Sequence, residues 1–179
     1  MNPIAIQYFK TPYGELVLGS FNEQLCLCDW RYRKMRARID ERLQQGLKTG
    51  MLEAASEVVN RTIQQLNDYF NRQRNTFEIP LLVVGSDFQR NVWDELLKIP
   101  FGQSASYGEL ALRLGNRKAV RAVASANGAN AISIIIPCHR IIGRDGSLVG
   151  YAGGLKAKER LLQLEQNSSV QTQQLLDLA

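Results

Sequence analysis

Residues that commonly mark metal sites or disulfide frameworks are scarce in this sequence. It contains three cysteines and one histidine, His139, among 179 residues. An odd number of cysteines without framework spacing does not fit a small disulfide-stapled secreted domain. Cys26 and Cys28 lie two apart on a predicted strand and should share one face, but no further cysteine or spare histidine completes a four-ligand zinc site. We therefore predict two core residues there and no metal.

Long hydrophobic runs are also missing. No apolar run approaches the ~18 residues that suggest a membrane-spanning helix, and the first residues lack the basic and apolar blocks of a secretion signal. We therefore expect a soluble, cytoplasmic protein. With 45% hydrophobic and 22% charged residues, the composition is that of a globular chain, long enough for one large domain or two small ones.

Acidic residues are absent from one segment of the chain. The stretch between Glu109 and Asp145 has no aspartate or glutamate, yet it carries six basic residues: Arg113, Arg117, Lys118, Arg121, Arg140 and Arg144. A solvated surface usually mixes charges of both signs. In a chain of net charge +5, this one-signed segment indicates a phosphate-bearing partner.

The first half of the chain predicts a mixed α/β domain. Apolar alternation and turn residues predict a β-meander with strands at 4–9, 15–20 and 25–30. Helical composition, apolar periodicity and a final apolar run then predict helices over 32–47 and 51–72 and a buried strand over 77–84. The basic residues of the first helix fit an exposed face better than a binding arm, because Asp40 and Glu41 interrupt them. We place this domain at residues 1–85.

The second domain, residues 86–179, predicts a helix-turn-helix outline. After a helix over 87–99, Ser106 and Glu109 can form a capping box for a helix over 107–114. A tight Gly-Asn turn separates it from a second short helix over 117–126. That helix is rich in alanine, and its arginines and lysine project. Tight helix packing explains the alanines as well as nucleic-acid binding does. It does not explain why the segment has no acidic residues, so we favour binding to nucleic acid.

The single histidine is adjacent to a cysteine, at Cys138 and His139. The apolar residues Ile132 to Ile136 predict a short buried strand, which Pro137 ends because proline has no N–H for a ladder. A side chain at such a break is fixed by the core yet open on one side. Taken alone, the pair fits a structural role as well as a functional one.

The last helix favours function. At about 100° per residue, residues 155–166 form an amphipathic helix with Lys158 and Glu165 on its apolar face. Buried charges are costly unless paired, and a spacing of seven strains direct pairing. We therefore expect Glu165 to accept from the His139 ring and Lys158 to lie near the Cys138 sulfur. Cysteine, histidine and glutamate would be the nucleophile, base and orienter of an activated thiolate, with a water between the first two.

These motifs resemble those of the O6-alkylguanine-DNA alkyltransferases, also called methylated-DNA–protein-cysteine methyltransferases. The signature is IPCHRIIG at 136–143, and three further motifs stand at the family's spacing: SYGELA at 106–111, RAVASANGAN at 121–130 and GYAGG at 150–154. The resemblance covers residues 87–166 well and the N-terminal half loosely. It implies an α+β fold. The N-terminal α/β domain would have an antiparallel, ribonuclease-H-like sheet, and the mostly helical C-terminal domain a winged helix-turn-helix-like DNA-binding motif.

The resemblance also implies a reaction. The protein would flip an alkylated guanine, and also an O4-alkylthymine, out of duplex DNA through the minor groove. It would move the alkyl group from guanine O6 to Cys138 without a cofactor. Because the thioether is not turned over, each molecule acts once, as a suicide enzyme. We expect a monomer acting on double-stranded DNA, with no membrane partner.

Roles for individual residues follow from the same resemblance. Tyr107 would donate a hydrogen bond to the departing guanine, Arg121 would fill the gap in the base stack, and Asn130 would be a hinge. The other expected DNA contacts come from the second short helix: Arg117, Lys118, Ala119, Ala122, Ser125 and Ala126. The substrate pocket would be formed by Tyr151, Ala152 and Gly153 and by the carbonyls of Cys138 and Ile141.

Two departures from the family's pattern stand out, and three other hypotheses stay open. Ala131 replaces a proline found in many members, and residues 167–179 add a polar, glutamine-rich tail. One alternative is an alkyltransferase-like lesion-binding protein, although that class has tryptophan in place of Cys138. A second is a thiol hydrolase or peptidase, which unlike a suicide enzyme would turn over. The third is a helix-turn-helix regulator in which the Cys-His-Glu set is accidental.

Overall fold

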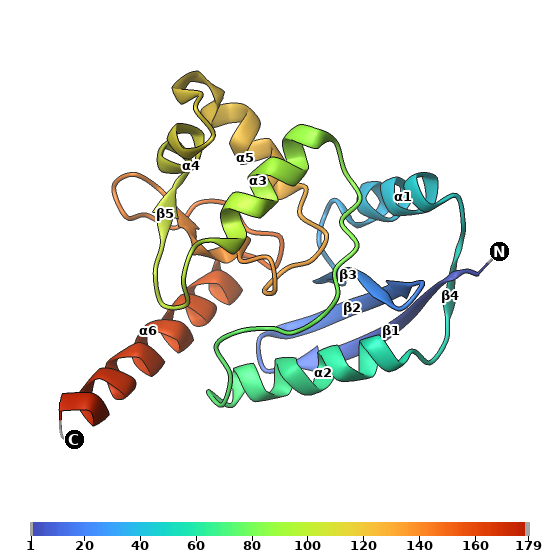
Figure 1. Cartoon of the computed structure of the whole chain (residues 1–179), viewed down its shortest axis with the longest axis horizontal. Helices are drawn as coiled ribbons and strands as arrows, with labels where there is room; N and C mark the ends of the chain where they lie inside the picture. Colours follow the sequence, from blue (N-terminus) through green and yellow to red (C-terminus); the bar gives the residue numbers. More distant parts are fainter. Residues whose placement is uncertain (1, 178–179) are drawn as a thin grey trace.

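The computed structural model describes residues 2–177, with side chains through Ser168. Its N-terminal half is built on a four-stranded sheet in the order β3-β2-β1-β4 (Figure 1). The predicted meander is confirmed, with β1 (Ile4–Thr11), β2 (Gly14–Phe21) and β3 (Gln24–Trp30) pairing antiparallel. The short strand β4 (Met51–Glu53) pairs parallel with β1, so the sheet is mixed rather than purely antiparallel.

Both N-terminal helices begin later than the sequence predicts. Residues 31–35 are mostly turns, and α1 spans Arg36–Leu47. The helix predicted from residue 51 is α2 (Glu57–Phe70), because residues 51–53 pair with β1 and Ser56 caps the helix by accepting from the Val59 amide. The turns that replace the start of α1 contact the second half of the molecule, through Arg33 to Gly128 and Asn130.

The two helices cover opposite faces of the sheet. Ile39 and Leu43 of α1 pack in one buried cluster with Val17 and Leu27. On the other face, Val59 and Leu66 of α2 join a larger cluster with Leu16 and Leu18. This larger cluster continues into the second half through Val92, Leu110 and Leu161, so one core spans both halves. The division at residues 85 and 86 stays a prediction.

Cys26 and Cys28 do not share a face. Gly19 pairs with Leu27 and Ser20 with Leu25, which leaves Cys26 as the extra residue of a β-bulge. The two cysteines therefore belong to the two different buried clusters. The prediction of a common face is wrong because the period-two rule fails across a bulge.

The segment predicted as a strand over 77–84 is mostly irregular. It touches the sheet through one bridge, Leu25 to Leu81, with hydrogen bonds from Leu25 N to Pro80 O (2.8 Å) and from Leu82 N to Leu25 O (2.9 Å). Pro80 has no N–H to extend the ladder, which explains why an apolar run does not become a strand here.

The second half holds the predicted helices. They are α3 (Asp87–Leu97), α4 (Tyr107–Arg113), the 3-10 turn η1 (Arg117–Ala119) and α5 (Val120–Gly128). The predicted capping box is confirmed: Ser106 Oγ accepts from Glu109 N (3.2 Å), and Glu109 Oε2 accepts from Ser106 N (2.6 Å). A two-residue parallel ladder joins β5 (Ala105–Ser106) to β6 (Ile141–Ile142).

The buried strand predicted over 132–136 is a closed turn. The Ile136 amide donates to Ile132 O (3.0 Å), Ile134 has a left-handed backbone (φ 73°), and the only bridge among these residues joins Ile132 to Cys28. The isoleucines are nevertheless buried, so the apolar run predicted burial correctly and strand structure wrongly.

The last helix, α6, is longer than predicted. It spans Leu155–Asp177 and absorbs most of the stretch expected to be a polar tail; residues 178 and 179 lie outside the described part. Within residues 2–177, no helix combines the length and apolarity that crossing a bilayer requires.

Candidate active site

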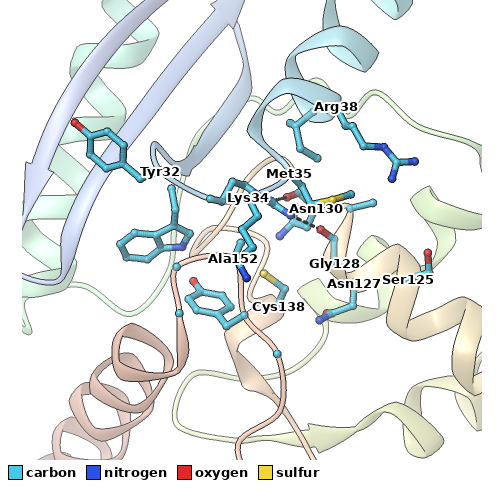
Figure 2. Close-up of a pocket in the computed structure, with 18 of the residues that line it drawn as sticks. Tyr32, Lys34, Met35, Arg38, Ser125, Asn127, Gly128, Asn130, Cys138 and Ala152 are labelled. Carbon is cyan, nitrogen blue, oxygen red and sulfur yellow. Dashed lines mark hydrogen bonds between the residues drawn. The ribbon is translucent and has the colours of Figure 1, made fainter.

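Cys138 lies at the junction of the two halves. It opens the 3-10 turn η2 (Cys138–Arg140) after Pro137, and only 4% of its surface is exposed. It lines a cavity of about 1060 Å³ whose walls come from residues 30–42, from the C-terminal part of α5 and from the loop 150–154. Figure 2 shows the sulfur pointing into this space, below the loop that carries Lys34 and Met35.

His139 is oriented by Glu165. The predicted contact is present: His139 Nε2 lies 2.7 Å from Glu165 Oε1, and both side chains are buried. Burial would raise the pKa of Glu165, but the neighbouring His139 and Arg140 outweigh it and lower the pKa to about 2. The carboxylate is therefore ionised and accepts, so Nε2 carries the proton. Burial also lowers the pKa of His139, which leaves a neutral ring.

The other ring nitrogen, His139 Nδ1, is available as a base. It is buried and has no hydrogen-bond partner among the described residues. In the tautomer that Glu165 imposes, Nδ1 carries a lone pair. The site thus has a neutral imidazole in the residue after the cysteine. The ionised Glu165 carboxylate on Nε2 can stabilise the imidazolium that forms when Nδ1 takes a proton.

Glu165 binds more partners than the sequence predicts. Arg140 binds it with two nitrogens, Nε to Oε2 (2.9 Å) and Nη2 to Oε1 (3.0 Å). The Tyr69 hydroxyl donates to Oε1 (2.7 Å) and Gly102 N to Oε2 (3.2 Å). The prediction that Arg140 belongs to a phosphate-facing group of cations is wrong, because its side chain is buried on this carboxylate. Its position next to His139 was the available signal, whereas nothing pointed to Tyr69.

The resting sulfur holds its proton. Burial raises the pKa of the Cys138 thiol, Asn130 and the charges of Arg33 and Lys158 lower it, and Asp29 raises it further, with burial the largest effect. Burial therefore disfavours, in the free protein, the activated thiolate that the sequence predicts at Cys138. The thiol proton must instead leave the sulfur during the reaction, and the neutral His139 ring is the base that can take it.

Lys158 is buried as predicted, but it is not hydrogen-bonded to the sulfur. Its ammonium donates to Val149 O (2.6 Å) and Gly150 O (3.4 Å), the residues that precede Tyr151 in the cavity wall. Burial lowers the pKa of Lys158 to about 8, and a negative charge on the Cys138 sulfur would oppose this shift. Lys158 thus holds the loop and adds positive potential near the thiol.

Asn130 holds the segment that leads to the sulfur. Its Nδ2 donates to Ile136 O (2.9 Å) and Ile132 O (3.4 Å), and its Oδ1 accepts from Ile132 N (2.9 Å). These bonds close the turn that replaces the predicted strand. They also fix the chain two residues before Cys138.

The cavity wall contains most of the predicted pocket residues. Tyr151, Ala152 and Gly153 line it, whereas Ile141 does not and lies buried in β6. Tyr107, which was predicted to contact the departing guanine, lines it too. A Cβ on Gly153 would stand 2.5 Å from the Trp30 ring, so glycine is needed for this close packing. Trp30 and the turn residues 32–35 also line the cavity. They were missed because sequence proximity cannot show that β3 ends beside loop 150–154.

Most of the predicted DNA-contacting residues are exposed or half-exposed. Five of the second helix's six candidates are exposed or half-exposed, as is Arg121. The sixth, Ala126, is buried in the core, and its carbonyl accepts from Trp93 Nε1 (2.9 Å). A DNA contact by the Ala126 side chain is therefore excluded, because it follows Val123 by one turn on the inner face of α5.

Comparison with known proteins identifies the family. Residues 87–167 match the DNA-binding domain model of 6-O-methylguanine DNA methyltransferase. A methylated-DNA–protein-cysteine methyltransferase of Methanosarcina acetivorans is 38% identical over 157 residues, 88% of this chain and 95% of the relative. One from Haemophilus influenzae is 40% identical over 166 residues, 92% of this chain and 88% of the relative.

Solved structures agree with the sequence relatives. The crystal structure of Mycobacterium tuberculosis O6-methylguanine methyltransferase is 36% identical, covers 92% of this chain and 94% of its own, and superposes with a TM-score of 0.77. The same organism's protein in complex with DNA gives a TM-score of 0.79 at the same identity and coverage. Both cover the two halves described above. The chain therefore belongs to the methylated-DNA–protein-cysteine methyltransferase family.

Proposed function

We propose that this protein repairs DNA by transferring the alkyl group of O6-alkylguanine to Cys138, once per molecule. The observation that carries the proposal is a cysteine at a cavity, next to a neutral histidine whose other nitrogen binds a buried carboxylate. The family names and the relative bound to DNA support DNA as the partner. The same pocket is proposed to accept O4-alkylthymine.

The proposed chemistry uses only side chains of this chain. His139 Nδ1, through a water, takes the thiol proton, and the imidazolium is stabilised by Glu165. The sulfur forms a bond to the alkyl carbon as the carbon–O6 bond breaks, with the electron pair leaving on the guanine. Tyr107 donates a hydrogen bond to that departing anion. A thioether is a poor electrophile, and no described residue is placed to hydrolyse it, so we expect no second turnover.

Access to the base requires that it leave the duplex. We propose that α4, η1 and α5 act as a helix-turn-helix of the winged type that enters the minor groove, with Arg121 filling the vacated stack. The exposed alanines and cations of this surface suit a close approach to phosphates. We also propose a ribonuclease-H-like N-terminal unit, which the strand order β3-β2-β1-β4 supports.

The direct test is a mass measurement. Protein mixed with duplex DNA containing one O6-methylguanine is expected to gain the mass of one methyl group on the peptide that bears Cys138, with no further turnover. Repeated turnover would instead indicate a hydrolase. A methyl group on Cys26 or Cys28 would show that Cys138 is not the nucleophile. We expect neither to react, because burial raises the pKa of Cys26 to about 12 and also raises that of Cys28.

A second test separates base flipping from chemistry. Arg121→Ala is expected to slow methyl transfer from duplex DNA about ten- to a hundredfold, while transfer from a free O6-alkylguanine base is unchanged, because the free base needs no flipping. Single-turnover rates on the two substrates provide the measurement. Arg61→Ala on α2, also an exposed arginine, serves as the matched control. Equal slowing on both substrates would contradict the flipping role of Arg121.

A further inference from the structure

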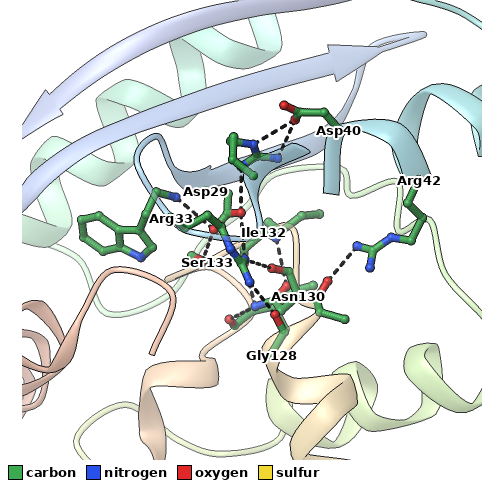
Figure 3. Close-up of polar contacts among 12 residues, drawn as sticks. Asp29, Arg33, Asp40, Arg42, Gly128, Asn130, Ile132 and Ser133 are labelled. Carbon is green, nitrogen blue, oxygen red and sulfur yellow. Dashed lines mark hydrogen bonds and ion pairs between the residues drawn. The ribbon is translucent and has the colours of Figure 1, made fainter. Parts of the chain in front are cut away.

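Arg33 joins the two halves of the molecule beside the nucleophile. Its side chain is only 5% exposed, although it lies in a turn between β3 and α1. Its Nη1 lies 2.9 Å from Asp29 Oδ2 and also donates to Asn130 O (3.2 Å), while Nη2 donates to Gly128 O (2.6 Å) (Figure 3). One guanidinium from the N-terminal half thus binds two carbonyls of the second half.

Those carbonyls belong to the end of α5 and to the residue that organises the cysteine segment. Gly128 is the last residue of α5, where carbonyls have no partner within the helix and a cation is favourable. Arg42 reinforces this end by donating to Ala129 O (2.7 Å). Asn130 in turn bonds Ile132 and Ile136, as described above. Arg33 therefore contacts both the proposed DNA-binding helix and the segment that positions Cys138.

The anchor on the N-terminal side is Asp29. It is fully buried and accepts from Ser133 Oγ (3.0 Å) as well as from Arg33 and Arg36. Beside it the main chain of Cys28 bonds Ala131 O (2.9 Å) and Ser133 N (2.6 Å). The positive charge of Arg33 also lowers the pKa of the Cys138 thiol, which opposes the effect of Asp29.

We propose that Arg33 is a positioning residue for alkyl transfer, which holds the C-terminal end of α5 and the Asn130–Cys138 segment in one fixed geometry. The proposal rests on the function proposed above. Neighbouring Arg36 shares the Asp29 carboxylate and also binds Asp40, but it has no hydrogen bond to the described part of the second half. Both arginines neutralise Asp29, but only Arg33 also contacts the active-site segment. Variants at the two positions therefore distinguish loss of that contact from loss of a charge beside Asp29.

The test compares Arg33→Met with Arg36→Met in single-turnover reactions at increasing concentrations of O6-methylguanine duplex. For Arg33→Met we expect the maximal rate to fall about ten- to a hundredfold with little change in the half-saturating concentration, because the exposed cations that bind DNA remain. Arg36→Met is expected to retain the wild-type maximal rate. A purely structural role would lower the folded fraction but leave the maximal rate of the folded protein unchanged.

Each outcome decides one question. Folded Arg33→Met that transfers at the wild-type maximal rate, or an equal loss in Arg36→Met, overturns the positioning role. Wild-type protein that transfers no methyl group at all means instead that the proposed function fails. Should Arg33→Met not fold, Arg33→Lys keeps the charge for Asp29 but replaces the two guanidinium nitrogens that bind Asn130 O and Gly128 O with a single ammonium on a shorter side chain. A severalfold lower maximal rate in that variant supports the proposal, and a wild-type rate refutes it.

Discussion

Cys138→Ala is expected to abolish methyl transfer while leaving affinity for DNA unchanged. The alanine removes the only thiol that lines the cavity among the described residues, whereas Cys26 and Cys28 lie in the core. DNA binding is proposed for the exposed cations of η1 and α5, which the substitution does not touch. Methyl transfer from a labelled duplex and a binding titration on the same duplex measure the two properties.

Cys26→Ala is the matched control for this experiment. It removes a buried thiol from the bulge in β3, in the cluster that does not contain Cys138. It should retain one equivalent of transfer. Joint loss of transfer and DNA binding in Cys138→Ala would mean that Cys138 has a structural role, and residual transfer would place the nucleophile elsewhere.

Glu165→Gln is expected to slow transfer about a hundredfold or more and to destabilise the fold by about 3–5 kcal/mol. The amide carries no charge to stabilise the His139 imidazolium, and it leaves the buried Arg140 cation without its carboxylate. Single-turnover rates and denaturant unfolding measure the two effects. Glu159→Gln, on the exposed face of the same helix, should leave both properties at the wild-type level.

The same carboxylate predicts how stability depends on pH. The pKa of Glu165 falls from 4.5 to about 2 on folding, so its contribution is present above pH 4.5 and is lost as the pH falls towards 2. His139 acts in the same direction, because its lowered pKa means that below pH 6.5 the unfolded chain takes up a proton more readily than the buried ring. Glu165→Gln should therefore lose less stability than the wild type between pH 4.5 and 2. Parallel acid unfolding curves would contradict this assignment.

Local rules predicted the parts of this fold that depend on neighbouring residues. The β-meander, the Ser106–Glu109 capping box and the apolar face of α6 each follow from a spacing of a few residues. The spacing of Lys158 and Glu165 on that face even predicted the contact with His139, because a buried carboxylate must find a donor. The chemistry-bearing centre was therefore accessible from the sequence.

Contacts between distant segments were not accessible in this way. Tyr69 reaches Glu165 across 96 residues, and Arg33 reaches Asn130 across 97. Residues 132–136 have the composition of a strand, but the Asn130 side chain closes them into a turn. A single sequence carries no signal for such partners, since each residue looks like an ordinary surface cation, core aromatic or loop amide.

The two-residue ladder of β5 and β6 has a consequence for the spacing of the reacting groups. Ala105 pairs with Ile141 and Ser106 with Ile142, so Tyr107 comes directly after one strand and η2, which begins with Cys138, directly before the other. The pairing thus fixes the main chain of Tyr107 and the main chain of Cys138 in one register before any DNA binds. An insertion or deletion of one residue on either side would shift one group relative to the other by a full residue length, so these two junctions should tolerate side-chain changes far better than changes in length.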